Sequence, residues 1–260
     1  MFFGRFFNGV SIFFVMSVSP LHASLCSELD SLKSEEKRLV LSSFFKTGKG
    51  EYGEGDVFLG ITVPVLRKVM LKYVHLSFSD IDALLKSPIH EHRLVGCYLL
   101  VWRFKHASVI DIRSRIEVYE FYVDHFLCIN NWDLVDTSCS QIVGAYMVLV
   151  PADRKWLFVW ATSLHLWTRR IAVVSCYAFI RLNQFDEILR LCSLLLTDSA
   201  DLMHKACGWM LREVGKRDMA RLCGFLDEYA LRMPRTMLRY SVERLSLEKR
   251  KYYMSLKEKV

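Results

Sequence analysis

Residues 201–216, DLMHKACGWMLREVGK, divide into two faces when they are wound as a helix. One face is apolar: Met203, Cys207, Met210 and Val214. The opposite face is basic and carries one indole: Lys205, Trp209, Arg212 and Lys216. Spacings of three and four residues put side chains on the same side of an α-helix. The pattern fits a helix that faces nucleic acid, or a core tryptophan covered by long basic side chains.

The same periodicity recurs along most of the chain. Pro64 precedes one apolar stripe, and Ser79 with Asp82 resembles a capping box at the start of the next helix. The further stripes are Leu66, Val69, Met70 and Tyr73; Leu94, Tyr98, Val101 and Trp102; Val135, Cys139, Ile142 and Tyr146; Trp167, Ile171, Val174 and Ala178; and Met219, Leu222, Cys223 and Leu226. Successive short helices predict an all-α fold, an α-solenoid of antiparallel helix pairs. A compact irregular bundle is the alternative, because no strict repeat is visible.

Composition supports a folded helical protein. Hydrophobic residues make up 52% of the 260 residues, which excludes wholesale disorder. The 12 glycines and 5 prolines are too few for the frequent turns of a β-sandwich or barrel. Glycines gather only at residues 48–60, where we expect an ordered loop; no P-loop motif follows them. The eight cysteines form no C-x-x-C pair, so we expect reduced core residues and no metal site.

The first 23 residues differ from the rest. They hold one basic residue, Arg5, and an apolar stretch over 10–18, which resembles a weak secretory signal. The competing explanation is an over-long reading frame with a true start at Met16, and the unpaired cysteines and the basic C-terminal part favour it. We therefore treat 1–23 as a leader or extension and 24–260 as one domain. The unpaired cysteines favour a cytoplasmic protein, with export as the alternative.

Positive charge concentrates near the C-terminus. The chain carries 35 basic and 28 acidic residues, a net charge of +7. Residues 201–260 hold 14 of the basic and 8 of the acidic residues, so +6 of that surplus lies there. Clustered positive charge indicates a polyanionic partner, although a merely solvated surface gives the same count.

Two shorter segments could carry chemistry. In 130–136, NNWDLVD, Asn131 fits an N-cap and Asp133 fits the first turn. Trp132 and Asp136 lie four residues apart, so an indole and a carboxylate share one helix face. In 166–171, LWTRRI, the pair Arg169 and Arg170 suits phosphate oxygens, or solvent.

These segments resemble the AlkD family of DNA alkylation-repair glycosylases. The matching blocks are FFKTG (44–48), YGEGDVFLGI (52–61), PVLRK (64–68 as P-x-L-R-K), NWDLVD (131–136), WTRR (167–170), KACGWMLREVGK (205–216) and MPRTMLRY (233–240). They appear in the family's order and extend from about residue 27 to 253. The resemblance implies a solenoid of HEAT-like helix pairs whose basic concave face holds duplex DNA. It also implies excision of cationic N3- and N7-alkylated purines, without metal or cofactor.

The resemblance also assigns roles to single residues. Asp136 is implied as the catalytic carboxylate, with Trp132 and Trp209 as aromatic walls and Arg170 as a phosphate clamp. The DNA-binding residues that we expect are Tyr52, Arg169, Lys205, Arg212, Lys216, Arg235 and Arg239. The expected partner of this monomer is double-stranded DNA with alkylated bases, and not a membrane. A non-catalytic HEAT-like protein that binds damaged or branched DNA is the alternative, and a protein-binding scaffold is a third reading.

Overall fold

The computed structural model describes residues 18–107 and 112–256, and helices are the only regular elements in those ranges. The first half holds α1 (Pro20–Ser31), α2 (Glu35–Phe44), α3 (Val63–Met70), α4 (Phe78–Leu85), α5 (His90–His106), α6 (Arg113–Asp124), α7 (Trp132–Cys139) and α8 (Ala145–Leu149). The second half holds α9 (Lys155–Ala161), α10 (Leu166–Ser175), α11 (Tyr177–Ile180), α12 (Asp186–Leu194), α13 (Asp201–Arg217), α14 (Met219–Tyr229), α15 (Arg235–Ser241) and α16 (Leu247–Ser255). A π-helical turn, Ser140–Gly144, joins α7 to α8.

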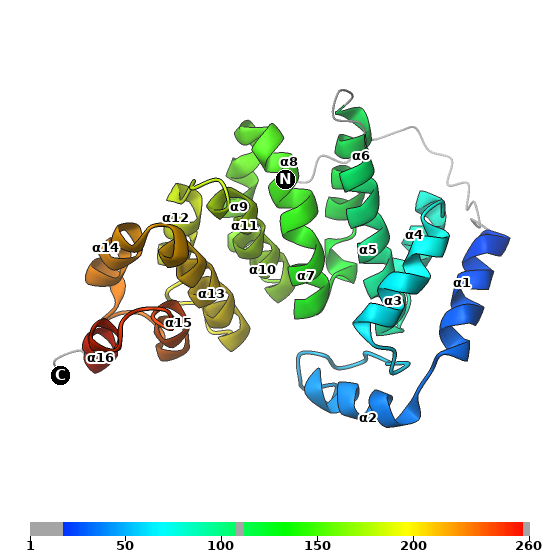
Figure 1. The fold of residues 1–260 in the computed structure, drawn as a ribbon, viewed down its shortest axis with the longest axis horizontal. Helices are drawn as coiled ribbons and strands as arrows, with labels where there is room; N and C mark the ends of the chain where they lie inside the picture. Colours follow the sequence, from blue (N-terminus) through cyan, green and yellow to red (C-terminus); the bar gives the residue numbers. More distant parts are fainter. Residues whose placement is uncertain (1–17, 108–111, 257–260) are drawn as a thin grey trace.

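The helices form a curved row from α1 at one end to α16 at the other (Figure 1). Through the middle of the row α5 packs on α7, α7 on α10, α10 on α13 and α13 on α15. The predicted all-α fold is confirmed. A solenoid packs each unit mainly against its neighbours, and the solenoid of HEAT-like helix pairs itself stays a prediction.

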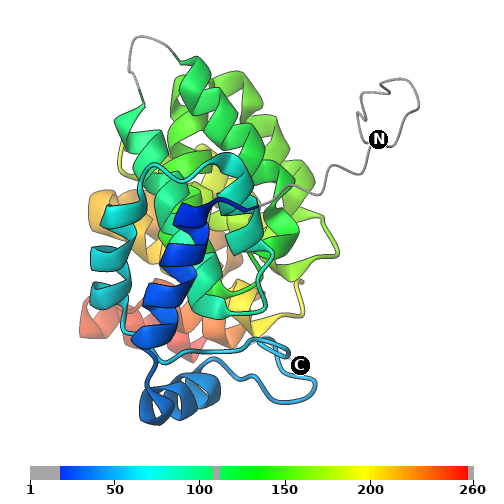
Figure 2. The same ribbon diagram turned by 90° about the vertical axis from the view of Figure 1, so that its right-hand side faces the viewer.

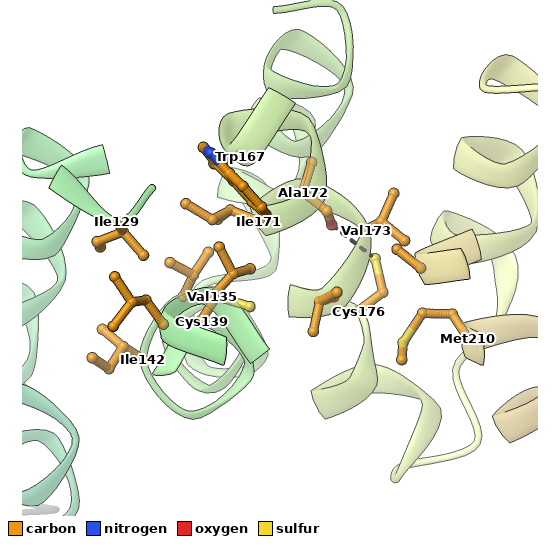
Figure 3. Close-up of a cluster of buried hydrophobic side chains, with 14 of the residues drawn as sticks. Ile129, Val135, Cys139, Ile142, Trp167, Ile171, Ala172, Val173, Cys176 and Met210 are labelled. Atoms are coloured by element: carbon orange, nitrogen blue, oxygen red, sulfur yellow. Dashed lines mark hydrogen bonds between the residues drawn. The ribbon is translucent and has the colours of Figure 1, made fainter. Parts of the chain in front are cut away.

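The core between α7, α10 and α13 follows the predicted stripes. Val135, Cys139 and Ile142 are fully buried and face Trp167 and Ile171 of α10 (Figure 3). Burial of each large apolar side chain stabilises the fold by about 1.5–3 kcal/mol. Because these residues turn into the core, the positions next to them in sequence, 136 and 170, are free to face elsewhere.

α13 has the two faces that its sequence predicts. Its apolar face is buried, with Met203, Cys207, Met210 and Val214 at most 1% exposed. Gly208 lets α15 approach closely, because a Cβ there would lie 2.5 Å from the carbonyl oxygen of Met237. This contact fixes the position of the next residue, Trp209.

One local prediction needs correction. The capping box at α4 is formed by Ser77 and Asp80, so the prediction of Ser79 with Asp82 is wrong by two residues. α1 begins at Pro20 with Ser19 as its N-cap, which is inside the segment that we set aside as a leader. Residues 1–17 lie outside the described part of the chain. The domain boundary therefore stays a prediction.

Residues 35–60, α2 with the loop that follows, form what we call the N-terminal arm. No residue of α2 is buried, and α2 stands at one edge of the molecule in both views (Figures 1 and 2). The predicted glycine loop is confirmed. Gly60 (φ +84°) ends it, where a Cβ would lie 2.2 Å from the Ser34 carbonyl oxygen. The buried carboxylate of Glu91 anchors the end of the arm by accepting the backbone N–H groups of residues 59, 60 and 61.

All eight cysteines are free, as predicted, and five of them are buried. Of the helices in the described ranges, none is both long enough and apolar enough to cross a membrane.

Candidate active site

Asp136 and Arg170 form a bidentate ion pair between α7 and α10. Arg170 Nε donates to Asp136 Oδ1 at 2.9 Å, and Arg170 Nη2 donates to Oδ2 at 2.8 Å. The same guanidinium donates from Nη1 to the carbonyl oxygen of Leu202, just inside α13. The pair therefore ties three helices together at one point. Two parallel N–H···O bonds match an ionised carboxylate, so Asp136 is held as an anion.

The surroundings of Asp136 have opposing effects on its ionisation. Burial raises the pKa of Asp136 above its ordinary value, while the charge and hydrogen bonds of Arg170 act in the opposite direction. The side chain of Asp136 keeps 18% of its exposure, whereas that of Arg170 keeps 6%. Asp136 is thus the member of the pair that a ligand can reach.

Asp136 lies in an open cleft of about 740 Å³, which we call the first cleft. The predicted site residues that line it are Tyr52, Trp132, Asp136, Arg170, Lys205, Trp209 and Arg212. They come from the N-terminal arm, α7, α10 and α13, which are far apart in sequence. The cleft therefore brings the carboxylate of Asp136 together with the half-buried indoles of Trp132 and Trp209. From the sequence, Trp132 and Asp136 were expected on one helix face, and Trp209 on the basic face of another helix.

The N-terminal arm fixes Trp132. Phe45 stacks on the indole at 5.2 Å between ring centroids, and Phe44 contacts its edge at 5.9 Å. Asn131 is the N-cap of α7, as predicted: its side-chain oxygen accepts from the backbone N–H of Trp132 at 2.8 Å. Tyr52 packs edge-on against Trp167 at 6.0 Å. Trp132 is therefore oriented by both its helix and the arm, and the arm forms one wall of the cleft.

A buried polar network behind Trp132 was missed by the sequence reasoning. His90, at the start of α5, contacts Asp133 at 2.8 Å through Nε2 and Asp56 of the arm at 3.1 Å through Nδ1. Burial disfavours the charged imidazole, but these hydrogen bonds outweigh it and raise the pKa of His90 to about 9. Asp56 also accepts from Arg93 and from the side-chain amide of Asn131. The network fastens the arm to the helix that carries Trp132 and Asp136.

The three basic side chains of the predicted face of α13 have acidic partners. Lys205 contacts Asp201 at 2.8 Å, Lys216 contacts Glu213 at 2.7 Å, and Arg212 pairs with Glu243. Two of these partners lie three or four residues away on α13 itself, a spacing visible in the sequence. The predicted basic face therefore carries less free charge than its composition suggests.

Four residues expected to bind DNA do not line the first cleft: Arg169, Lys216, Arg235 and Arg239. Arg169 forms an ion pair with Asp198 at 2.7 Å, and Arg235 donates to the carbonyl oxygen of Met254 at 2.7 Å. The guanidinium of Arg239 lies 6.0 Å from the ring centroid of Tyr240. Their contacts with DNA stay predictions.

Among the described residues, His, Cys, Asp and Glu side chains do not gather in any group that could hold a metal ion.

Comparison with known proteins identifies the family. Residues 25–245 match the DNA alkylation repair enzyme family. The structure resembles a "Predicted DNA alkylation repair enzyme from Enterococcus faecalis", with a TM-score of 0.65 and 17% identity over 83% of this chain and 97% of that one. A second solved structure, smu.31 from Streptococcus mutans UA159, has a TM-score of 0.46 and 15% identity over 90% of this chain and 98% of that one. No curated protein matches the chain. The family match covers most of the chain, which therefore belongs to the DNA alkylation repair enzyme family.

Proposed function

We propose that this protein is a monofunctional DNA glycosylase that releases cationic N3- and N7-alkylated purines from duplex DNA. The observation that carries the proposal is the reachable carboxylate of Asp136, which lines one cleft with the indoles of Trp132 and Trp209. Family membership supports a role in DNA alkylation repair, and the cleft contains groups that could stabilise a sugar cation.

The charge of the substrate explains what the protein has to provide. An alkylated purine already carries a positive charge, so the C1′–N bond can break with its electron pair moving to the base. The base leaves as a neutral molecule, and no general acid has to protonate it. The sugar becomes an oxocarbenium-like cation, as in glycoside hydrolysis. Stabilising that cation is the remaining task.

Asp136 suits this task because its negative charge is fixed beside the cleft before any reaction begins. A preorganised charge in a partly buried site stabilises a developing opposite charge more than it would in water. Water then adds to C1′, and its proton passes to Asp136 or to solvent. The electron-rich faces of Trp132 and Trp209 add cation–π attraction to the same sugar.

Arg170 favours the alternative, a protein that binds damaged or branched DNA without reacting. Its guanidinium neutralises Asp136 through two hydrogen bonds, which lowers the negative potential that a sugar cation would meet. For catalysis, the carboxylate needs to retain accessible lone pairs. Each oxygen of Asp136 accepts one bond from Arg170, and a carboxylate has about four acceptor positions, so two positions stay available.

The test is release of 7-methylguanine and 3-methyladenine from methylated duplex DNA by the wild type and by Asp136→Asn. The variant keeps the shape of the side chain and removes its charge. We expect release by the wild type and a rate about 10²–10³ lower for the variant, the usual loss when one electrostatic stabiliser is removed. Asp186→Asn is the matched control. That carboxylate is 81% exposed and does not line the first cleft.

The outcomes separate the alternatives. Equal release by the wild type and Asp136→Asn removes Asp136 from its role and keeps the enzyme. Absence of release, together with tight and salt-sensitive DNA binding, establishes the non-catalytic binder. Weak binding that does not respond to salt supports the protein-binding scaffold, because phosphate contacts always weaken as salt rises.

A further inference from the structure

A second cleft of about 670 Å³ is also lined by Asp136. Asp136 and Trp209 line both clefts, so the two clefts adjoin at the candidate catalytic carboxylate. The second cleft continues past the π-helical turn, where Ser140 and Gln141 line it. Its apolar side includes Phe104 and Leu182.

The second cleft carries three cations: Lys105 at the end of α5, Arg115 in α6 and Arg181 after α11. None of them has an acidic partner among the described residues. Asp136 is the one carboxylate among the described lining residues, and Arg170 already neutralises it. The second cleft therefore has a net positive charge that no side chain within residues 18–107 and 112–256 balances.

Arg115 is the most constrained of the three cations. Its guanidinium lies 5.5 Å from the ring centroid of Phe104, and its Nε is buried without a hydrogen-bond partner. An unpaired buried donor is unfavourable, and an anion that accepts its hydrogen bond would relieve that cost. Arginine forks bind phosphate oxygens in pairs, and lysine adds a point charge.

The first cleft differs in its free charge, although it too contains a buried arginine Nε without a hydrogen-bond partner, that of Arg212. Three of its four cations, Arg170, Lys205 and Arg212, already bind carboxylates, and only Lys46 lacks an acidic partner among the described residues. A phosphate there has to displace an existing ion pair. A phosphate in the second cleft gains its contacts without that loss.

We propose that the second cleft binds the phosphodiester groups of DNA that continues past the lesion, with Lys105, Arg115 and Arg181 as the contacts. The proposal rests on the proposed function only in taking DNA as the ligand, and it does not depend on catalysis. DNA bound at Asp136 is adjacent to both clefts, because Asp136 and Trp209 line both. Three cations without an acidic partner among the described residues line the second cleft.

The experiment is an anisotropy titration of a labelled, undamaged duplex at several salt concentrations. It compares the wild type with Lys105→Gln, Arg115→Gln, Arg181→Gln and the triple variant. Each cation that is removed should reduce the magnitude of the negative slope of log K against log salt by about 0.9. It should also weaken binding by about tenfold at 0.1 M salt. Arg190→Gln with Arg221→Gln is the matched control; both residues line a different hollow, remote from Asp136, and should leave slope and affinity unchanged.

Arg115→Lys separates charge from packing. It keeps the positive charge while changing the contact with Phe104, so it should bind DNA more tightly than Arg115→Gln at equal thermal stability. The proposal is overturned if the triple variant has the wild-type slope and affinity, or if the wild type fails to bind DNA. A reduced slope upholds it even when no alkylated base is released, so its failure and that of the proposed function are distinguishable.

Discussion

Arg170→Gln is the substitution that tests most directly how the candidate site is built. The variant removes two hydrogen bonds of 2.8–2.9 Å to Asp136 and one of 2.7 Å to the Leu202 carbonyl oxygen. It leaves a carboxylate whose side chain is only 18% exposed without its counter-charge. Removing one partner of a buried ion pair costs about 3–5 kcal/mol, most of it the cost of the charge left behind. We expect a loss of that size at pH 7.

The pH dependence of this loss identifies the charge that causes it. Burial already raises the pKa of Asp136, and loss of the guanidinium raises it further. The folded variant then binds a proton that the unfolded chain releases. Its free energy of unfolding should therefore increase as pH falls through the raised pKa towards the ordinary value for Asp. The wild type should show a smaller increase.

The assay is urea unfolding, followed by circular dichroism between pH 5 and 8, for a double-mutant cycle. The cycle contains the wild type, Arg170→Gln, Asp136→Asn and the double variant, which carries no uncompensated charge. The double variant should be more stable than Arg170→Gln alone. Arg38→Gln is the control, because its pair with Glu35 is exposed on α2 and its loss should leave the midpoint unchanged. Additive losses in the cycle, or a pH-independent loss, would refute the reasoning.

Two further predictions concern the supports of the site. The pKa of about 9 for His90 lies above its ordinary value of 6.5. The difference is equivalent to about 3 kcal/mol in the free energy of unfolding. This contribution is fully present below pH 6.5 and is lost as pH rises through 9. His90→Gln should therefore lose less stability than the wild type between pH 7 and 10, measured by urea unfolding; an equal decline contradicts the ionic contact with Asp133. Gly208→Ala should destabilise by about 1–3 kcal/mol, because its Cβ meets the Met237 carbonyl oxygen at 2.5 Å. Gly224→Ala, with open space at its Cβ, should gain up to about 1 kcal/mol; equal melting temperatures for the two variants would contradict the close approach.

Local spacing predicted the helices well because burial of a helix face depends on neighbours three and four residues away. It could not choose between two overlapping capping boxes at α4. Ser77 with Asp80 and Ser79 with Asp82 both have the required spacing. Asp80 is selected because it also accepts hydrogen bonds from the backbone and hydroxyl of Ser19, which is 61 residues away. A long-range contact thus decided a local feature.

In the candidate site, too, local spacing was predictable from the sequence and long-range contacts were not. Trp132 and Asp136 are one turn apart on α7, so their common face was predictable. The partner of Asp136 lies 34 residues away, and the contact of His90 with Asp133 joins helices that are 43 residues apart. Apolar and polar periodicity contains no information about which distant carboxylate meets which cation. The resemblance pointed to residues that line one cleft, without showing that Arg170 holds Asp136.

The distribution of free charge explains why sequence reasoning favoured α13 over the second cleft. A window along α13 contains Lys205, Arg212 and Lys216, so their charge is conspicuous, yet the acids that neutralise them are on the same helix or across from it. Lys105 and Arg181 lie 76 positions apart in the sequence and belong to different helical segments, so no window contains both. Phosphate binding depends on the charge that stays unpaired after folding, because a paired cation has to give up one partner to gain another. Only the folded chain shows that Lys105, Arg115 and Arg181 line one cleft together with Asp136.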